Sequence, residues 1–103
     1  MNLEVFLDAE VHEARKNLPA FWRQGVRDAI DGLTSDPRPP RSSALDITGI
    51  NVPPGIEVRR IRIDPWRIVY AVNEGSGWIW VLALRRRPPY GYEDLQALID
   101  RLE

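Results

Sequence analysis

Three consecutive arginines stand at the end of a strongly apolar, strand-like segment in WVLALRRRPPYGYEDLQ, residues 80–96. Arg85, Arg86 and Arg87 follow five apolar residues, and Tyr90 and Tyr92 lie beyond a pair of prolines. The planar guanidinium group forms paired, charge-assisted hydrogen bonds with phosphate oxygens. Binding residues are often held where a rigid element ends. The run therefore predicts a phosphate-binding edge with tyrosines beside it.

Residues on two preceding strand-like segments suit the same chemistry. Arg60 and Arg62 are two residues apart, so they share one face of an extended strand and are candidates to converge with the run. Arg67 lies inside the apolar segment WRIVYAV, where a charge is costly unless a carboxylate such as Asp64 pairs with it. Trp66 is the tryptophan best placed to stack on an RNA base.

The distribution of charge is more informative than its sum. The 103 residues carry a net charge of −1. Residues 59–87 hold seven arginines against Asp64 and Glu74, which gives +5, and the remaining residues give −6. A basic stripe on an acidic body favours an anionic partner, although arginines on solvent-facing strand positions would give the same count.

Composition excludes several kinds of site. Cysteine is absent, so the chain has no disulfide, thiolate nucleophile or cysteine-based zinc site. His12 falls in a predicted helix and is expected to face solvent, and neither a metal nor another cofactor is expected. No run approaches the ~18 apolar residues of a membrane span. The N-terminus lacks a signal-peptide pattern, so a cytoplasmic location without membrane contact is expected.

Hydrophobic periodicity predicts a single domain over residues 1–103, with the element order β-α-α-β-β-β-α. Short turns separate the last three strands, so these strands must be antiparallel neighbours. Residues 44–55 are expected to be irregular. The expected elements are a strand at 3–7, helices from 8 to about 17 and from 19 to about 33, strands at 56–64, 66–73 and 78–86, and a terminal helix at about 92–102.

The last two strands are largely apolar on both faces, which is typical of central strands covered on both sides. We therefore expect an α+β fold, with a helical hairpin on one face of a mostly antiparallel four-stranded sheet and the terminal helix over the other face. The apolar stripe of the second helix includes Phe21 and Trp22 and is expected to face the sheet. Tyr70 is expected in the core.

These features together resemble the RelE/ParE family of bacterial type II toxins. The resemblance rests on the element order, the NLP helix junction, the DPRPP loop, and RIDPWRIVYAV leading into an apolar strand that ends in arginines. It spans residues 3–92, and WRIVY is its most specific part. It implies a cognate antitoxin that wraps the toxin and often displaces its terminal helix.

The family has two branches. RelE-like members cleave mRNA in the ribosomal A site without a metal, as the 2′-hydroxyl attacks the adjacent phosphate and leaves a 2′,3′-cyclic end. ParE-like members share the fold but inhibit DNA gyrase. The arginine constellation favours the endoribonuclease, since a gyrase inhibitor does not need it. The alternatives are a gyrase-inhibiting toxin and a catalytically silent member that binds a protein partner.

The resemblance also implies roles for single residues. By position, Arg67 would contact the scissile phosphate, and Arg87, or else Arg86 or Arg85, would stabilise charge that develops in the transition state. The other residues implied in phosphate or RNA binding are Arg60, Arg62, Arg85, Arg86 and Trp66.

A tyrosine is the expected proton acceptor, because arginine is almost always protonated. Neighbouring arginines would lower the pKa of such a tyrosine. Tyr92 and Tyr90 are the two candidates. Tyr92 also falls on the apolar stripe of the predicted terminal helix, where it would only pack.

Overall fold

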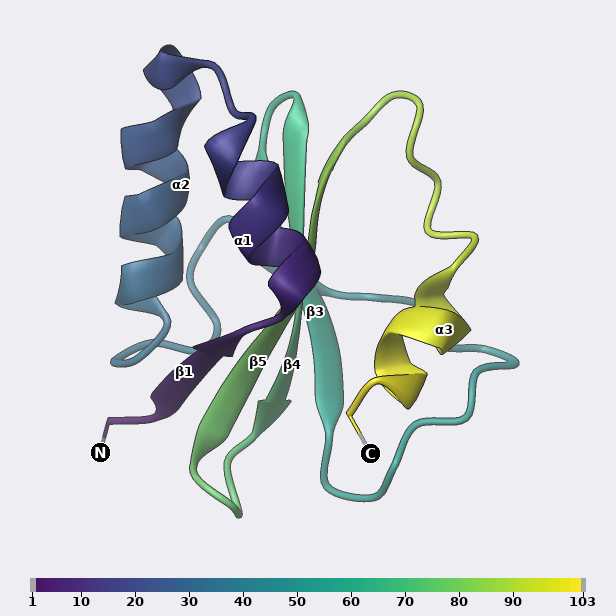
Figure 1. Cartoon of the computed structure of the whole chain (residues 1–103). Coiled ribbons are helices and arrows are strands. Elements are labelled where there is room, and N and C mark those ends of the chain that lie inside the picture. The colour runs from purple at the N-terminus through teal and green to yellow at the C-terminus, as the bar shows by residue number, and fades with distance from the viewer. Residues whose placement is uncertain (1, 103) are drawn as a thin grey trace.

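The computed structural model describes residues 2–102 and has three layers (Figure 1). A five-stranded sheet in the order β1-β5-β4-β3-β2 lies between α1 and α2 on one face and α3 on the other. β1 runs parallel to β5, and the other neighbours are antiparallel. The elements are β1 Glu4–Leu7, α1 Ala9–Lys16, α2 Ala20–Gly32, β2 Ser42–Ala44, β3 Glu57–Ile63, β4 Trp66–Asn73, β5 Trp78–Arg86 and α3 Leu95–Asp100.

The predicted α+β architecture is confirmed, with two corrections. The sheet has five strands rather than four, because residues 42–44 pair with β3. That strand has the sequence SSA, whose short polar run lacks the apolar alternation that marks a strand. α3 begins at Leu95 rather than at Tyr92, whose φ of 67° is incompatible with an α-helix.

Local sequence explains where the hairpin helices begin and end. The Asp8 carboxylate accepts a hydrogen bond from the Glu10 backbone N–H at 3.1 Å and caps α1. Pro19 immediately precedes α2. The first N–H groups of a helix have no partner within it, so the N–H that proline lacks is not missed there. The prolines of the DPRPP loop follow α2 and cannot extend it. The two helices therefore form the hairpin that the sequence predicts.

The sheet separates two apolar cores. One lies under the hairpin and includes Val11, Val26, Leu33 and Tyr70, all fully buried or nearly so. The other lies under α3, where Leu95, Leu98 and Ile99 pack on residues of β3, β4 and β5. Terminal-helix cover of the second face is thus confirmed, and so is the core position of Tyr70.

Phe21 does not follow the predicted apolar stripe. Its side chain is 83% exposed, whereas its neighbour Trp22 packs against the core under the hairpin. Successive helical residues are about 100° apart around the axis. Phe21 therefore points away from the sheet when Trp22 points toward it.

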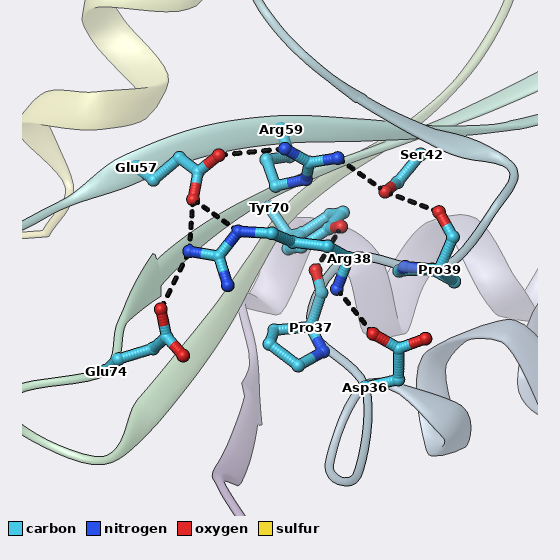
Figure 2. A network of polar contacts seen from close by, with 9 residues as sticks. All are labelled: Asp36, Pro37, Arg38, Pro39, Ser42, Glu57, Arg59, Tyr70 and Glu74. Carbon is cyan, nitrogen blue, oxygen red and sulfur yellow. Dashed lines mark hydrogen bonds and ion pairs between the residues drawn. The ribbon is translucent and has the colours of Figure 1, made fainter.

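The DPRPP loop is fixed to the sheet by the polar network in Figure 2. Arg38 donates to Glu57 at 2.6 Å and to Glu74 at 2.7 Å, and so bridges β3 to the turn after β4. The buried Tyr70 hydroxyl donates to the Pro37 carbonyl oxygen at 2.7 Å. The other bonds join Asp36 to the Arg38 N–H, Arg59 to Glu57 and Ser42, and Ser42 to Pro39.

Within residues 2–102, no helix combines the length and the apolar character needed to cross a membrane.

Candidate phosphate-binding face

A row of three arginines crosses the three central strands of the sheet, one residue from the β3–β4 turn. Arg62 on β3 lies opposite Arg67 on β4, and Arg67 lies opposite Arg85 on β5. Arg67 shares its sheet face with Val69, which packs in the core under α3, so the row lies on the α3 side. Like charges directly opposite one another on neighbouring strands destabilise a sheet. The row must therefore be compensated by nearby carboxylates or serve an anionic ligand.

One carboxylate compensates two members of the row. Asp64 accepts from the Arg62 Nε at 3.1 Å and from an Arg67 terminal nitrogen at 2.9 Å. The Arg67 side chain is only 9% exposed and also donates to the Trp66 carbonyl oxygen. The hydrogen bonds from Arg62 and then Arg67 hold the pKa of Asp64 below its usual value. The expected pairing of Arg67 with Asp64 is confirmed.

Arg85 is held by carboxylates from two helices. It binds Glu10 of α1 through two nitrogens, at 2.6 and 2.8 Å, and Asp94 at the start of α3 at 3.0 Å. Arg101 binds Glu10 and Asp8 at 3.1 Å each. These contacts tie α1, β5 and α3 together, and they neutralise most of the charge of Arg85.

Arg60 and Arg87 keep their charge available. Neither forms an ion pair with any residue in the range 2–102. Arg60 lies opposite Val69, which places it on the α3 side with the row. Arg87 is exposed, and its guanidinium carbon lies 5.3 Å from the centre of the Tyr92 ring. The face therefore combines five arginines, two of which are uncompensated.

Tyr90 does not have the lowered pKa that the sequence suggested. Burial raises the pKa of its hydroxyl, and a 2.7 Å hydrogen bond donated to Asp94 raises it further. Arg85 lies 4.9 Å from the ring centre, but its attraction for the phenolate is the smaller effect. Tyr90 is therefore a poor proton acceptor at neutral pH.

Tyr92 combines two unfavourable features. Its φ of 67° is one that a bulky side chain adopts at a cost of about 1–3 kcal/mol. Its hydroxyl is buried and has no hydrogen-bond partner among residues 2–102. The Tyr92 ring packs edge-on against Tyr90, with ring centres 4.8 Å apart. Unfavourable local features of this kind are most common at functional sites.

Two predicted RNA-binding residues lie on the other face. Trp66 packs against the core under the hairpin, and Arg86 lies opposite Trp66 in the β4–β5 register, so it shares that side. The expected stacking of Trp66 beside Arg67 has no support from this arrangement, because consecutive strand residues point to opposite faces. His12 is exposed on α1, as expected.

Glu10 and Asp94 were not predicted as partners of Arg85. Glu10 is 75 residues away in the chain and reaches Arg85 because β1 runs parallel to β5. The signal that the sequence did contain is a carboxylate in the first turn of the helix that follows a strand. The register of β1 against β5, on which the contact depends, cannot be read from the sequence. Among residues 2–102, no three histidine or carboxylate side chains gather where they could hold a metal ion.

The contacts of Arg85 predict a loss of stability in acid. The Arg85 hydrogen bonds lower the pKa of Glu10, and bonds from Tyr90 and Arg85 outweigh burial to lower the pKa of Asp94. Groups with a depressed folded-state pKa stabilise the fold above their unfolded values, about 4.3 and 3.9. We therefore expect stability to be constant down to about pH 5 and to fall through the window below about pH 4.

Urea unfolding at about pH 7 and about pH 3 measures this effect. The Glu10→Gln/Asp94→Asn double variant is the control, because it lacks both titrating groups. Its stability should fall less between the two pH values than that of the wild type. An equal fall in both proteins would mean that other carboxylates cause the acid sensitivity.

Comparison with known proteins identifies the fold. No family model and no curated protein matches the chain. Among solved structures, it is similar to a chain of the archaeal RelE–RelB complex from Pyrococcus horikoshii, with 25% identity and a TM-score of 0.72 over 87% of this chain and 100% of that one. A mutant Escherichia coli RelE toxin in the free state gives 13% identity and a TM-score of 0.66 over 99% and 98% of the two chains. A chain of the Mycobacterium tuberculosis RelBE toxin–antitoxin complex gives 16% identity and a TM-score of 0.64 over 84% of this chain and 100% of that one. The chain therefore has the RelE toxin fold.

Proposed function

We propose that this chain is the toxin of a type II toxin–antitoxin pair and that it cleaves mRNA on the ribosome without a metal ion. The 2′-hydroxyl of one nucleotide attacks the adjacent phosphate and leaves a 2′,3′-cyclic phosphate. The bond between phosphorus and the 5′-oxygen of the next nucleotide breaks as the new bond forms, and that oxygen takes up a proton from water. The protein acts in the cytoplasm, where its substrate is.

The observation that carries this proposal is the arginine row and its two uncompensated neighbours. A sheet with no anionic ligand gains nothing from placing Arg62, Arg67 and Arg85 directly opposite one another. A phosphodiester bound across the row would add negative charge where three carboxylates leave five guanidinium groups only partly neutralised. Arg60 and Arg87 are the groups that such a phosphate would engage first, since neither is bound to a carboxylate.

The chemistry requires cations on the equatorial phosphate oxygens. Arg67 is buried and held by Asp64, so its guanidinium group is oriented before substrate binds. Preorganised donors of this kind stabilise developing charge without reorganisation during the reaction. Arg87 lies at the end of the sheet, where it can approach the same phosphate from solvent. Arg60 contributes positive charge from the neighbouring strand.

Tyr92 is the better candidate for the group that accepts the 2′-hydroxyl proton. The Tyr90 hydroxyl already donates to Asp94, whereas the Tyr92 hydroxyl has no partner within residues 2–102. Because the Tyr92 hydroxyl is buried, the segment that carries it must move when substrate binds. The absence of a competing hydrogen bond lowers the free-energy cost of that movement.

The two tyrosines should therefore respond in opposite ways to removal of the hydroxyl. Tyr92→Phe is expected to slow mRNA cleavage by about 10²–10⁴-fold, the usual contribution of a general acid or base. It should also keep or increase stability, because a buried unpaired hydroxyl costs about 1–3 kcal/mol. Tyr90→Phe should lose about 1 kcal/mol of stability, because it lacks the bond to Asp94. Its cleavage rate should stay near the wild-type value.

Single-turnover cleavage and urea unfolding of both variants provide the measurement. Equal cleavage by Tyr92→Phe and wild type would exclude the proton-transfer role. A matching loss of stability in both variants would instead indicate that the Tyr92 hydroxyl is hydrogen-bonded.

Purified ribosomes programmed with a defined mRNA test the function itself. The 5′ ends of the downstream fragments would be mapped by primer extension after the reaction is quenched, with Arg67→Ala protein as the inactive reference. The expected result is cleavage in the A site by the wild type alone, with upstream fragments whose 3′ ends can be ligated only after a phosphatase opens and removes the cyclic phosphate. No cleavage on ribosomes or on free RNA would overturn the proposal. A gyrase supercoiling assay would then test the alternative.

The proposed partner is a cognate antitoxin. Two of the similar structures are complexes of a RelE-type protein with its antitoxin. Production of this chain alone should therefore arrest growth, and production of Arg67→Ala protein should not.

A further inference from the structure

A second basic surface lies away from the arginine row, in an open groove between α1 and α2. The groove has a volume of about 580 Å³. Its lining includes four cationic side chains and no carboxylate, with Leu18 as an apolar contact. The four cations are Arg15, Lys16, Arg23 and Arg27.

These charges are available to a ligand. Arg15 forms no ion pair with any residue in the range 2–102. Lys16 lies 3.6 Å from Glu13, and Arg27 lies 3.9 Å from Asp31, and in both pairs the side chains are about two-thirds exposed or more. Exposed pairs at these distances are weak and readily exchanged for a stronger anion.

Arg23 is held in place by the backbone. Its Nε donates to the Leu18 carbonyl oxygen at 3.0 Å, and a terminal nitrogen donates to the Lys16 carbonyl oxygen at 3.5 Å. These carbonyl groups lie at the junction that follows α1. The bonds fix the guanidinium group at the mouth of the groove, with its other terminal nitrogen free to bind an anion.

The sequence concentrates positive charge in this segment. Residues 12–27 carry four basic side chains against Glu13, which gives +3 in a chain whose net charge is −1. Residues 1–11, 28–58 and 88–103 each carry −3, and the arginine-rich segment 59–87 carries +5. The chain therefore has only two basic segments. One forms the candidate phosphate-binding face, and the other forms the groove.

Both basic surfaces lie at the same end of the molecule. The junction between α1 and α2 and the turn between β3 and β4 lie at the top of Figure 1, and the end of β5 pairs with the start of β4 beside that turn. Arg86 stands on the hairpin side of the sheet at that end, is exposed and has no ion pair within residues 2–102. It adds positive charge on the same side of the sheet as the groove.

We propose that the groove between α1 and α2 binds the phosphodiester backbone of RNA, outside the segment that is cleaved. This inference deepens the proposed function, on which it rests. The RNA is either ribosomal RNA beside the A site or the message beyond the cut. Both present the same ligand chemistry, a run of phosphates without base recognition.

The test measures binding, so that it does not depend on cleavage. Fluorescence anisotropy with a labelled single-stranded RNA, and co-sedimentation with ribosomes, would be recorded over a range of salt concentrations. The Arg15→Gln/Arg27→Gln double variant removes two groove charges. Its matched control, Asn2→Asp/Ser76→Asp, changes the net charge by the same amount beside the N-terminus and in the turn between β4 and β5, which lie at the bottom of Figure 1. Thermal unfolding of each variant would check that the fold is intact.

The expected result is a shallower salt dependence for the groove variant alone. Each phosphate contact on a single strand contributes about 0.7 to the slope of log affinity against log salt concentration. Loss of two contacts should reduce the slope by about 1.4, and the control should keep the wild-type slope. A loss on ribosomes but not on free RNA would assign the groove to ribosomal RNA, and a loss on both would assign it to the message.

Three outcomes would overturn the inference. The first is an equal salt slope in the wild type and the groove variant. The second is an equal decrease of the slope in the groove variant and the control. The third is wild-type binding to polyglutamate as tight as to RNA. The last would indicate an acidic protein partner. If the groove variant loses RNA binding and the wild type nevertheless cleaves no RNA, the groove assignment holds and the endonuclease proposal fails.

Discussion

Replacement of Arg67 with alanine is expected to slow mRNA cleavage on the ribosome by about 10²–10³-fold, as loss of one preorganised donor does in other enzymes. The reason is the position of the side chain. It is 9% exposed, lies at the centre of the arginine row and is oriented by Asp64 before substrate arrives. Single-turnover cleavage of ribosome-bound mRNA, followed by primer extension, measures the effect.

Two further variants separate charge, geometry and stability. Arg67→Lys keeps the charge but loses the planar fork that binds two phosphate oxygens, so its rate should fall between those of wild type and Arg67→Ala. Arg38→Ala also removes an arginine that is bound to carboxylates, but on the DPRPP loop away from the row. It should cleave at the wild-type rate. An equal loss in Arg38→Ala and Arg67→Ala would attribute both effects to the fold.

Replacement of Leu98 with alanine is expected to lower the free energy of unfolding by about 2–5 kcal/mol, the range for a buried leucine. Leu98 is fully buried and packs in the core under α3, with Val69, Ala71 and Leu82 among its cluster. α3 has only six residues, so it depends on these contacts rather than on its own helix propensity. Urea unfolding at neutral pH measures the loss.

Phe21→Ala is the matched control for this prediction. It removes a larger apolar side chain, but one that is 83% exposed. Its effect should stay within about 0.5 kcal/mol, as for most surface substitutions. A large loss in Phe21→Ala, or a small one in Leu98→Ala, would contradict the burial that the structure assigns to these residues.

These two residues also show what periodicity can and cannot predict. The repeat of apolar residues located α2 and its buried side correctly, because Val26, Ile30 and Leu33 recur at helical spacing. It also placed Phe21 on the buried side, which is wrong. Periodicity does not show how wide the buried part of a stripe is, because that width depends on how closely the helix approaches the sheet. The strand at residues 42–44 was not predicted, because it is defined by backbone pairing to β3. The pattern of side chains in the sequence does not indicate that pairing.

The candidate site divides in the same way. Alternation along the strand was sufficient to place Arg60 and Arg62 on one face, since a strand has a fixed period of two. That Arg67 shares this face follows from the β3–β4 register. The sequence could not predict that Glu10 would neutralise Arg85, because that contact depends on the parallel register of β1. The state of Tyr90 likewise depends on a bond to Asp94, whose geometry is set by the turn before α3.

The short outer strands of the sheet have a consequence for behaviour at high concentration. β2 has three residues and β1 has four, and these are the two edges of the sheet. Each edge offers few unpaired backbone groups to a strand of another molecule, and Pro39 and Pro40 stand just before β2, where they have no N–H to donate. Edge-to-edge addition is the common first step toward fibrils. We therefore expect this chain to resist aggregation through its sheet, even when no other protein covers it.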